Sequence, residues 1–303
     1  MALTTAAGCG GHASQSMGDL ASMPRAATAQ GSSWIARNAS QGDLLYVGQP
    51  DDGAVTIYSF PQGQVVGQLL GLGYVNNLCS DDRGDVWIMA SLSSYGSRLY
   101  EYAHGGRRIT TLIDSLGEGW ACGVDPTTGD LAVANEVGGD YRSNVAIYAN
   151  GSGVPAQYAM PDVDWPFSAT YDNVGDLFVG GQVSVYDAGT DWLPRGTYEF
   201  KRFKARPNTR THVGAQWGDK QLTEIAHPEL IHRYSIANGK ASFLGSMTLD
   251  VSRIRNFVVH QRYLIASGGS SIYVFNFPDG GSPTETFAPN YYVSGIALSV
   301  RRN

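Results

Sequence analysis

The sequence predicts an all-β protein, a six-bladed β-propeller, and three observations carry that prediction. A phrase made of Gly-Asp followed by a short apolar strand recurs along the chain. Successive copies are 42 to 46 residues apart, which is the length of one four-stranded propeller blade. The third strands of the repeats, as at residues 57–60 and 272–277, show the period-two alternation of half-buried strands. The copies start at Gly42, Gly84, Gly129 and Gly175, with degenerate copies at Gly218 and Gln261.

The order of strands within a blade is clearest in the second repeat. An inner strand comes first, and each later strand lies further out, with glycine and aspartate at the turns. The layout between residues 182 and 210 cannot be placed uniquely. The other strands are expected at about 55–60 and 64–70 in blade 1, 75–80, 85–90, 98–103 and 108–114 in blade 2, 120–124, 130–134, 144–149 and 155–160 in blade 3, 213–217, 222–225 and 230–236 in blade 5, and 271–277 and 284–288 in blade 6.

The last strand predicts how the ring closes. Residues 293–299 have the small and apolar character of an inner strand, but no blade follows them. Blade 1 opens with a second-strand phrase, so we expect the C-terminal inner strand to complete blade 1. Closure of this kind removes exposed sheet edges. Residues 34–36 compete for the same inner position, so the clasp can involve both termini.

The chain divides into a disordered tether, residues 1–33, and the propeller, residues 34–303. The tether is rich in Ala, Gly, Ser and Thr and has no apolar period that could form a core. Its segment 6–11, Ala-Ala-Gly-Cys-Gly-Gly, resembles the end of a bacterial lipoprotein signal, although only eight residues precede Cys9. That resemblance implies a lipid anchor at Cys9 and an extracytoplasmic location. The alternative is a small-residue leader with no such meaning.

Composition excludes some partners. The net charge of −6 argues against nucleic acid, which needs a basic face. No run of 18 apolar residues exists, so we expect no transmembrane segment. Cys79 and Cys122 fall on equivalent inner strands but are offset by one residue, so they should face opposite sides of their strands. We expect two small buried core residues, with a disulfide as the alternative.

Several phrases carry a family resemblance. They are residues 42–47, 100–106, 125–133 and 145–148. They resemble uncharacterised bacterial six-bladed β-propeller proteins, which are similar to NHL-repeat and SMP-30-like propellers. The resemblance covers residues 34–303. It implies a six-bladed fold and often export, and it implies no particular activity.

The loops that enter the inner strands of a propeller share one face, which is the usual binding face. Aromatic rings beside carboxylates and amides on that face suit a polar ligand such as a sugar. We therefore expect a non-catalytic binding or scaffold module outside the cytoplasm, whose partner is a polar small molecule, a glycan or another protein. The candidate ligand-binding residues are Asn77, Glu118, Trp120, Asp164, Trp165, Tyr291 and Tyr292.

Whether the protein is an enzyme stays open at this point. SMP-30-like lactonases hold a divalent metal with Glu, Asn and Asp from inner-strand entrances, and Glu118 and Asn135 offer two such ligands. A metal-dependent hydrolase with a cation such as Ca²⁺ is thus one alternative, and a lyase with a His–Glu pair is another. Otherwise we expect no cofactor. A basic cluster between residues 201 and 210 is a competing contact for an anionic glycan or lipid headgroup.

Overall fold

The computed structural model describes residues 32–93, 96–137, 142–160, 163, 165–183, 197–198, 201–202, 213–218, 221–227, 230–237, 240–251 and 254–302. Residues 32–303 form one compact unit. The predicted tether, residues 1–33, lies outside the described residues except for its last two positions, where Ser33 Oγ accepts a hydrogen bond from Leu70 N at 2.9 Å. Regular structure in the described part is all strand, apart from the short 3-10 turns η1 (Ala39–Gln41) and η2 (Ala149–Gly151).

The described strands form six antiparallel sheets. The first has five strands, in the order β1-β4-β3-β2-β25. The second and third have four strands each and run β5-β6-β7-β8 and β9-β10-β11-β12. Their bounds are β1 (Trp34–Ile35), β2 (Asp43–Gln49), β3 (Ala54–Phe60), β4 (Val65–Leu69), β25 (Ile296–Ser299), β5 (Tyr74–Ser80), β6 (Val86–Ser93), β7 (Gly96–Tyr102), β8 (Arg108–Asp114), β9 (Glu118–Val124), β10 (Leu131–Val137), β11 (Arg142–Tyr148) and β12 (Ala156–Met160).

The remaining three sheets follow the same order along the chain. In the fourth, β14 pairs with β13 on one side and with β15 and β16 on the other. The bounds here are β13 (Trp165–Tyr171), β14 (Leu177–Val183), β15 (Thr197–Tyr198), β16 (Lys201–Arg202), β17 (Val213–Gly218), β18 (Gln221–His227), β19 (Leu230–Ala237), β20 (Lys240–Thr248), β21 (Asn256–His260), β22 (Tyr263–Gly268), β23 (Ser271–Asn276) and β24 (Glu285–Phe287).

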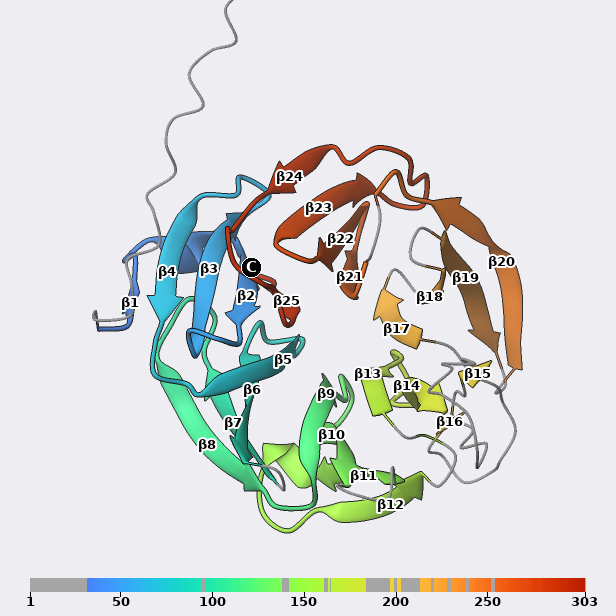
Figure 1. The fold of residues 1–303 in the computed structure, drawn as a ribbon, viewed down its shortest axis with the longest axis horizontal. Helices are drawn as coiled ribbons and strands as arrows, with labels where there is room; N and C mark the ends of the chain where they lie inside the picture. Colours follow the sequence, from blue (N-terminus) through green and yellow to red (C-terminus); the bar gives the residue numbers. More distant parts are fainter. Residues whose placement is uncertain are drawn as a thin grey trace, which may run out of the picture. The chain divides into compact units, whose positions relative to one another are not determined.

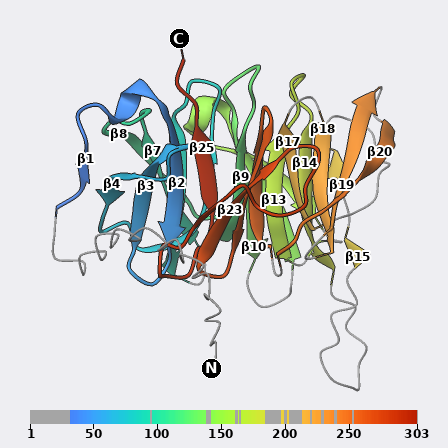
Figure 2. The same cartoon turned by 90° about the horizontal axis from the view of Figure 1, so that it is seen from above.

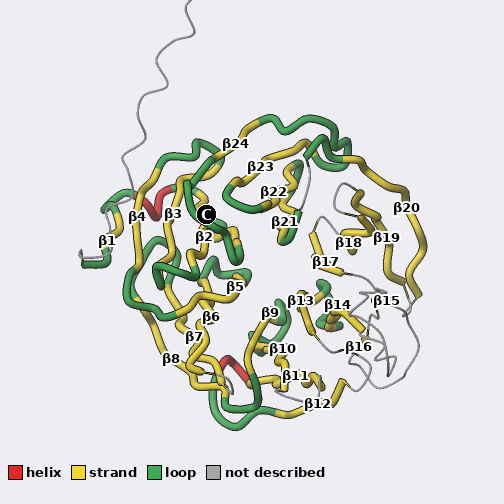
Figure 3. The backbone as a smooth tube through the Cα atoms, in the orientation of Figure 1, coloured by secondary structure: helices red, strands yellow, loops and turns green. Residues whose placement is uncertain are grey.

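One strand of each sheet lies nearest the middle of this unit, and Figure 1 shows the sheets arranged around these strands. The inner strands are neighbours in the order β5, β9, β13, β17, β21, β25 and again β5. Figure 2 shows the strands from the side, where they stand next to one another along one direction, and Figure 3 shows the loops and turns between the strands in green. Each sheet therefore presents one inner-strand entrance to a common face of the unit.

The turns after β5 and β13 explain the recurring Gly-Asp phrase. Asp81 Oδ1 accepts hydrogen bonds from the backbone N–H groups of Arg83 and Asp85, both at 2.8 Å. Gly84 lies in the left-handed region at φ +84°, a conformation that favours glycine. Asp172 and Gly175, at φ +81°, repeat the arrangement. The phrase marks a structural turn, because an aspartate four residues before the aspartate of the phrase closes the turn and the glycine permits it.

The two ends of the described chain meet the first sheet at opposite edges. β25 pairs with β2 on the inner side, in a register that sets Leu44 opposite Ser299 and Val47 opposite Ile296. β1 pairs with β4, with Trp34 opposite Gln68, so it is the outermost strand of that sheet. The expectation that residues 34–36 compete for the inner position is therefore wrong. Two residues are too few to replace the inner pairing that β25 makes over four positions.

Cys79 and Cys122 form a disulfide, with the two Cα atoms 5.7 Å apart, so the expectation of two unpaired core thiols is wrong. The one-residue offset was read correctly, since Cys79 lies opposite Trp87 while Cys122 lies opposite Val133. Adjacent sheets pack face to face, however, and opposite faces of equivalent strands then meet in the layer between them. Cys122 and Trp87 belong to that buried layer, with Cys79 packed against it. The offset brings the sulfur atoms together.

Candidate functional site

A bulge recurs near the entrance of four inner strands. The register of β5 against β6 shifts between Val75 and Asn77, which leaves Asn76 as the extra residue. The same shift leaves Trp120 unpaired in β9, Phe167 in β13 and Gly214 in β17. Bulges re-aim one side chain relative to the regular alternation and are frequent beside binding sites. Each of these four entrances therefore carries one residue that alternation alone does not place.

Glu118 is held at the entrance of β9 by groups of the neighbouring sheet. Its Oε1 accepts a hydrogen bond from Ser91 Oγ at 2.6 Å, and Asn76 Nδ2 lies 3.5 Å from the same oxygen. Asn76 also donates to Ser91 Oγ and to Gly119 O, both at 2.8 Å. Ser91 falls after the strand expected at 85–90, but it lies in β6, which continues to Ser93. The carboxylate is thus oriented by a serine that the sequence did not single out.

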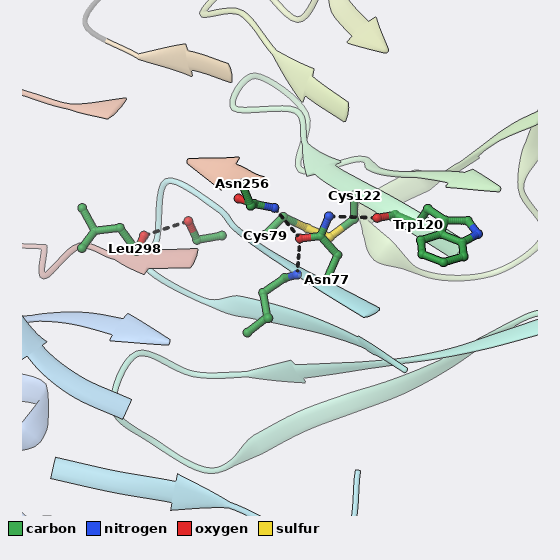
Figure 4. The surroundings of a disulfide bond; sticks show 8 residues. Asn77, Cys79, Trp120, Cys122, Asn256 and Leu298 are labelled. Atoms are coloured by element: carbon green, nitrogen blue, oxygen red, sulfur yellow. Dashed lines mark hydrogen bonds between the residues drawn. A yellow bond between two sulfur atoms is a disulfide. The ribbon is translucent and has the colours of Figure 1, made fainter. Parts of the chain in front are cut away.

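Asn77 joins three inner strands, as Figure 4 shows. Its Nδ2 donates to Trp120 O of β9 at 2.8 Å, and its Oδ1 accepts from Asn256 Nδ2 of β21 at 3.1 Å. The same oxygen accepts from Leu78 N at 2.8 Å. A Cβ at Gly295 would lie 2.5 Å from this oxygen, so the glycine lets the C-terminal segment approach β5 closely. Asn77 is 7% exposed and is used for internal contacts.

Trp120 and Trp165 are both half-buried at the entrances of β9 and β13. The indole Nε1 of Trp120 is buried and has no hydrogen-bond partner within the described residues. An indole N–H usually finds an acceptor when it is buried, so this unpartnered donor is unusual. Asp164, the candidate that precedes Trp165, lies outside the described residues.

Tyr291 and Tyr292 differ in the hydrogen bonds of their hydroxyl groups and in the exposure of their rings. The Tyr291 hydroxyl lies 3.4 Å from the Tyr58 hydroxyl and also bonds to Thr56 and Gln49, and burial raises its pKa. Tyr292 is 40% exposed, accepts a hydrogen bond from Arg255 Nη1, and has that guanidinium 5.2 Å from its ring centre. Only Tyr292 therefore offers an exposed ring, and it comes with a cation already in place.

The two candidate metal ligands have different surroundings. Asn135 is fully buried, and its Nδ2 donates to Asp114 Oδ2 at 2.8 Å and to Asn144 Oδ1 at 3.2 Å. Burial raises the pKa of the Asp114 carboxyl. Glu118 instead contacts Ser91 and Asn76, as described above. Within the described part of the chain, no three His, Cys, Asp or Glu side chains gather as a metal site would require.

The histidines with described side chains near the inner strands lie at the other ends of the sheets. His104 Nδ1 is 2.6 Å from Ser299 Oγ, in the turn after β7. His260 ends β21, and burial lowers the pKa of its imidazole. In the basic cluster, Lys201 and Arg202 form β16, and their backbones pair with Val179 and Phe178. Lys204, Arg206 and Arg210 lie outside the described residues.

Comparison with known proteins identifies a fold and no family. No family model matches the chain, and no curated protein matches it in sequence. A protein of unknown function from Bacteroides caccae is similar in structure, with a TM-score of 0.56 at 12% identity over 86% of this chain and 100% of that one. A functionally unknown protein from Desulfotomaculum acetoxidans gives 0.57 at 8% identity over 86% and 99%.

The third similarity gives the architecture its name. The β-propeller domain of Cps50 (Swd1) from Myceliophteria thermophila has a TM-score of 0.50 at 14% identity, over 84% of this chain and 85% of that one. The protein is therefore an all-β protein with a β-propeller arrangement. In the described residues, no helix has the length and apolar character that crossing a membrane would need.

Proposed function

We propose that the chain is a six-bladed β-propeller in which each sheet is one blade and β25 completes blade 1. Three observations support this reading. The described strands form six sheets, their inner strands are neighbours in a closed order, and β25 pairs with β2. The NHL-repeat and SMP-30-like resemblance of the sequence agrees with six blades.

The propeller's function on this proposal is to bind a polar ligand, such as a sugar, at the inner-strand entrances. The observation that carries it is the Glu118 carboxylate, oriented by Ser91 and Asn76 beside the half-buried Trp120. Ligand sites combine apolar rings with a few fixed polar groups, and this entrance has both. Binding through a ring and a fixed carboxylate requires no catalytic nucleophile or metal, so we propose a binding module and not an enzyme.

The proposed location is outside the cytoplasm. A disulfide that joins two inner strands supports it, because structural disulfides persist in oxidising compartments and are rare in the cytosol. With Cys79 and Cys122 paired, Cys9 is the remaining cysteine of the sequence, and it is the residue that the lipoprotein-like segment would present for lipid attachment. Metabolic labelling with a fatty acid, in wild type and in Cys9→Ala, tests that attachment.

Calorimetric titration with a panel of neutral sugars tests the binding proposal. Trp120→Ala and Trp165→Ala should each weaken the affinity for any sugar that binds by about tenfold or more, because a ring at the centre of a site contributes upward of about 1.4 kcal/mol. Trp34→Ala is the matched control, since Trp34 is 47% exposed on the outermost strand β1. Binding that survives both inner-strand substitutions would place the site elsewhere.

The hydrolase and lyase alternatives have their own readout in the same titration. A neutral sugar or a lactone that is turned over, with loss of turnover on chelation, would favour the metal-dependent hydrolase. Turnover that persists with the chelator present would favour the lyase. Stable binding without turnover supports the binding module.

A further inference from the structure

Two carboxylates face each other across the entrance of the third sheet. In the register of β9 and β10, Glu118 lies directly opposite Glu136, and both side chains are half-buried. Directly opposed residues on antiparallel strands have Cβ atoms roughly 5 Å apart, and like charges at such positions destabilise the pair. The ion pairs among described residues are all made by Arg83, so neither glutamate is neutralised there.

A buried amide oxygen at the same place also lacks a partner. Asn76 is 6% exposed, and its Oδ1 accepts no hydrogen bond within the described residues. The orientation of this amide is fixed, because Gly119 O can only accept and therefore faces Nδ2. A buried acceptor left without a donor is unfavourable, so a donor from a ligand would be favoured.

We propose that this entrance binds a protonated primary amine, carried on a sugar-sized ligand. An ammonium group supplies three donors and one positive charge, which match the carboxylates of Glu118 and Glu136 and the free Oδ1 of Asn76. Trp120, two residues further along β9 than Glu118, adds a ring face that attracts cations. The unpartnered Nε1 of Trp120 supplies a donor for a hydroxyl or ring oxygen of the same ligand. An amino sugar combines these groups, and this inference rests on the proposed function.

Oligomers of glucosamine and of N-acetylglucosamine with equal length are the probes. They share a scaffold and differ at the nitrogen of each sugar unit, which is an amine in the first and a neutral acetamide in the second. At pH 6, where a primary amine is protonated, wild type should bind the glucosamine oligomer at least about tenfold more tightly, as a hydrogen bond to a charged group allows. Glu118→Gln should remove most of that preference, and Glu136→Gln should reduce it. Thermal unfolding of each variant confirms that it is folded.

Asp82→Asn is the control for net charge. Asp82 is exposed in the turn at the other end of β5, so its loss changes the total charge equally without touching the entrance. The glucosamine preference should be unchanged in this variant. An equal loss in Asp82→Asn and Glu118→Gln would show attraction to the acidic protein as a whole and would overturn the inference.

The remaining outcomes separate this inference from the proposed function. Equal binding of the two oligomers, lost in Trp120→Ala, overturns the amine inference and leaves the sugar-binding proposal standing. Spermidine is a third probe. If spermidine binds in a Glu118-dependent way and no sugar binds, the ammonium site is supported and the sugar-binding proposal is contradicted. If no probe binds, both proposals fail.

Discussion

Removal of the disulfide should destabilise the propeller by an amount that follows from its place in the sequence. Cys79 and Cys122 are 43 residues apart, and the bond links adjacent inner strands. In the chain-entropy model, closing a loop of that length removes about 13 cal/mol/K from the unfolded state, or about 4 kcal/mol at 25 °C. Unfolding of the unit formed by residues 32–303 has an entropy of about 0.57 kcal/mol/K at a per-residue value of about 2.1 cal/mol/K. The double variant Cys79→Ala/Cys122→Ala should therefore melt about 7 °C lower.

Circular dichroism melting of wild type and the double variant measures this shift. Cys9→Ala is the control and should leave the Tm unchanged. Alkylation of the denatured, unreduced protein should leave Cys79 and Cys122 unmodified, which mass spectrometry of their peptides detects. Alkylation of both cysteines in protein from an oxidising compartment would refute the pairing. A double variant that melts within about 2 °C of wild type would refute the loop-entropy reasoning.

Three further perturbations test the pairing of β25 with the first sheet, the close approach of Gly295 to β5, and the titration of His260. Deletion of residues 291–303 should abolish cooperative melting, because it removes the inner strand of the first sheet; a normal melt would contradict the closure. Gly295→Ala should cost about 1–3 kcal/mol in denaturant unfolding, since its Cβ would lie 2.5 Å from a side-chain oxygen of β5, whereas Gly42→Ala, with nothing within 4 Å, should cost little. Burial lowers the pKa of His260, so below about pH 6.5 the unfolded state takes up a proton that the folded state does not. Stability is therefore lost as the pH falls, and His260→Gln should lose less Tm than wild type between pH 7.5 and 5.5; equal losses would exclude this histidine as the cause.

The sequence predicts those parts of the fold that depend on residues close together in the chain, such as turns and single strands. Gly84 and Gly175 adopt positive φ in turns that an aspartate closes, so the Gly-Asp phrase marks the same turn in successive repeats. Strand alternation then gives the boundaries to within a few residues, as at Arg108–Asp114, which was predicted with the same bounds. These features depend on neighbours in the sequence, and alternation with period two is enough to find them.

The relations between sheets were harder to read, because they depend on which faces meet. The offset of Cys79 and Cys122 was taken to separate them, and the packing of adjacent sheets reverses that conclusion. The outer position of β1 depends on the free edge of β4, which nothing in residues 34–36 specifies. A single-sequence pattern describes one strand at a time, so contacts across the layer between two sheets have no signal in it.

The bulge in β5 decides how the two adjacent asparagines divide their roles. Strict alternation puts one of the pair on each face, and the sequence favoured Asn77 as the ligand contact. In the structure, Asn77 Oδ1 accepts hydrogen bonds from Leu78 N and Asn256 Nδ2, and Asn77 Nδ2 donates one to Trp120 O. Asn76, the extra residue of the bulge, has its Nδ2 3.5 Å from Glu118 Oε1, and its Oδ1 has no partner among the described residues. On the proposed function, the unused hydrogen-bonding capacity lies with Asn76, while Asn77 links three inner strands.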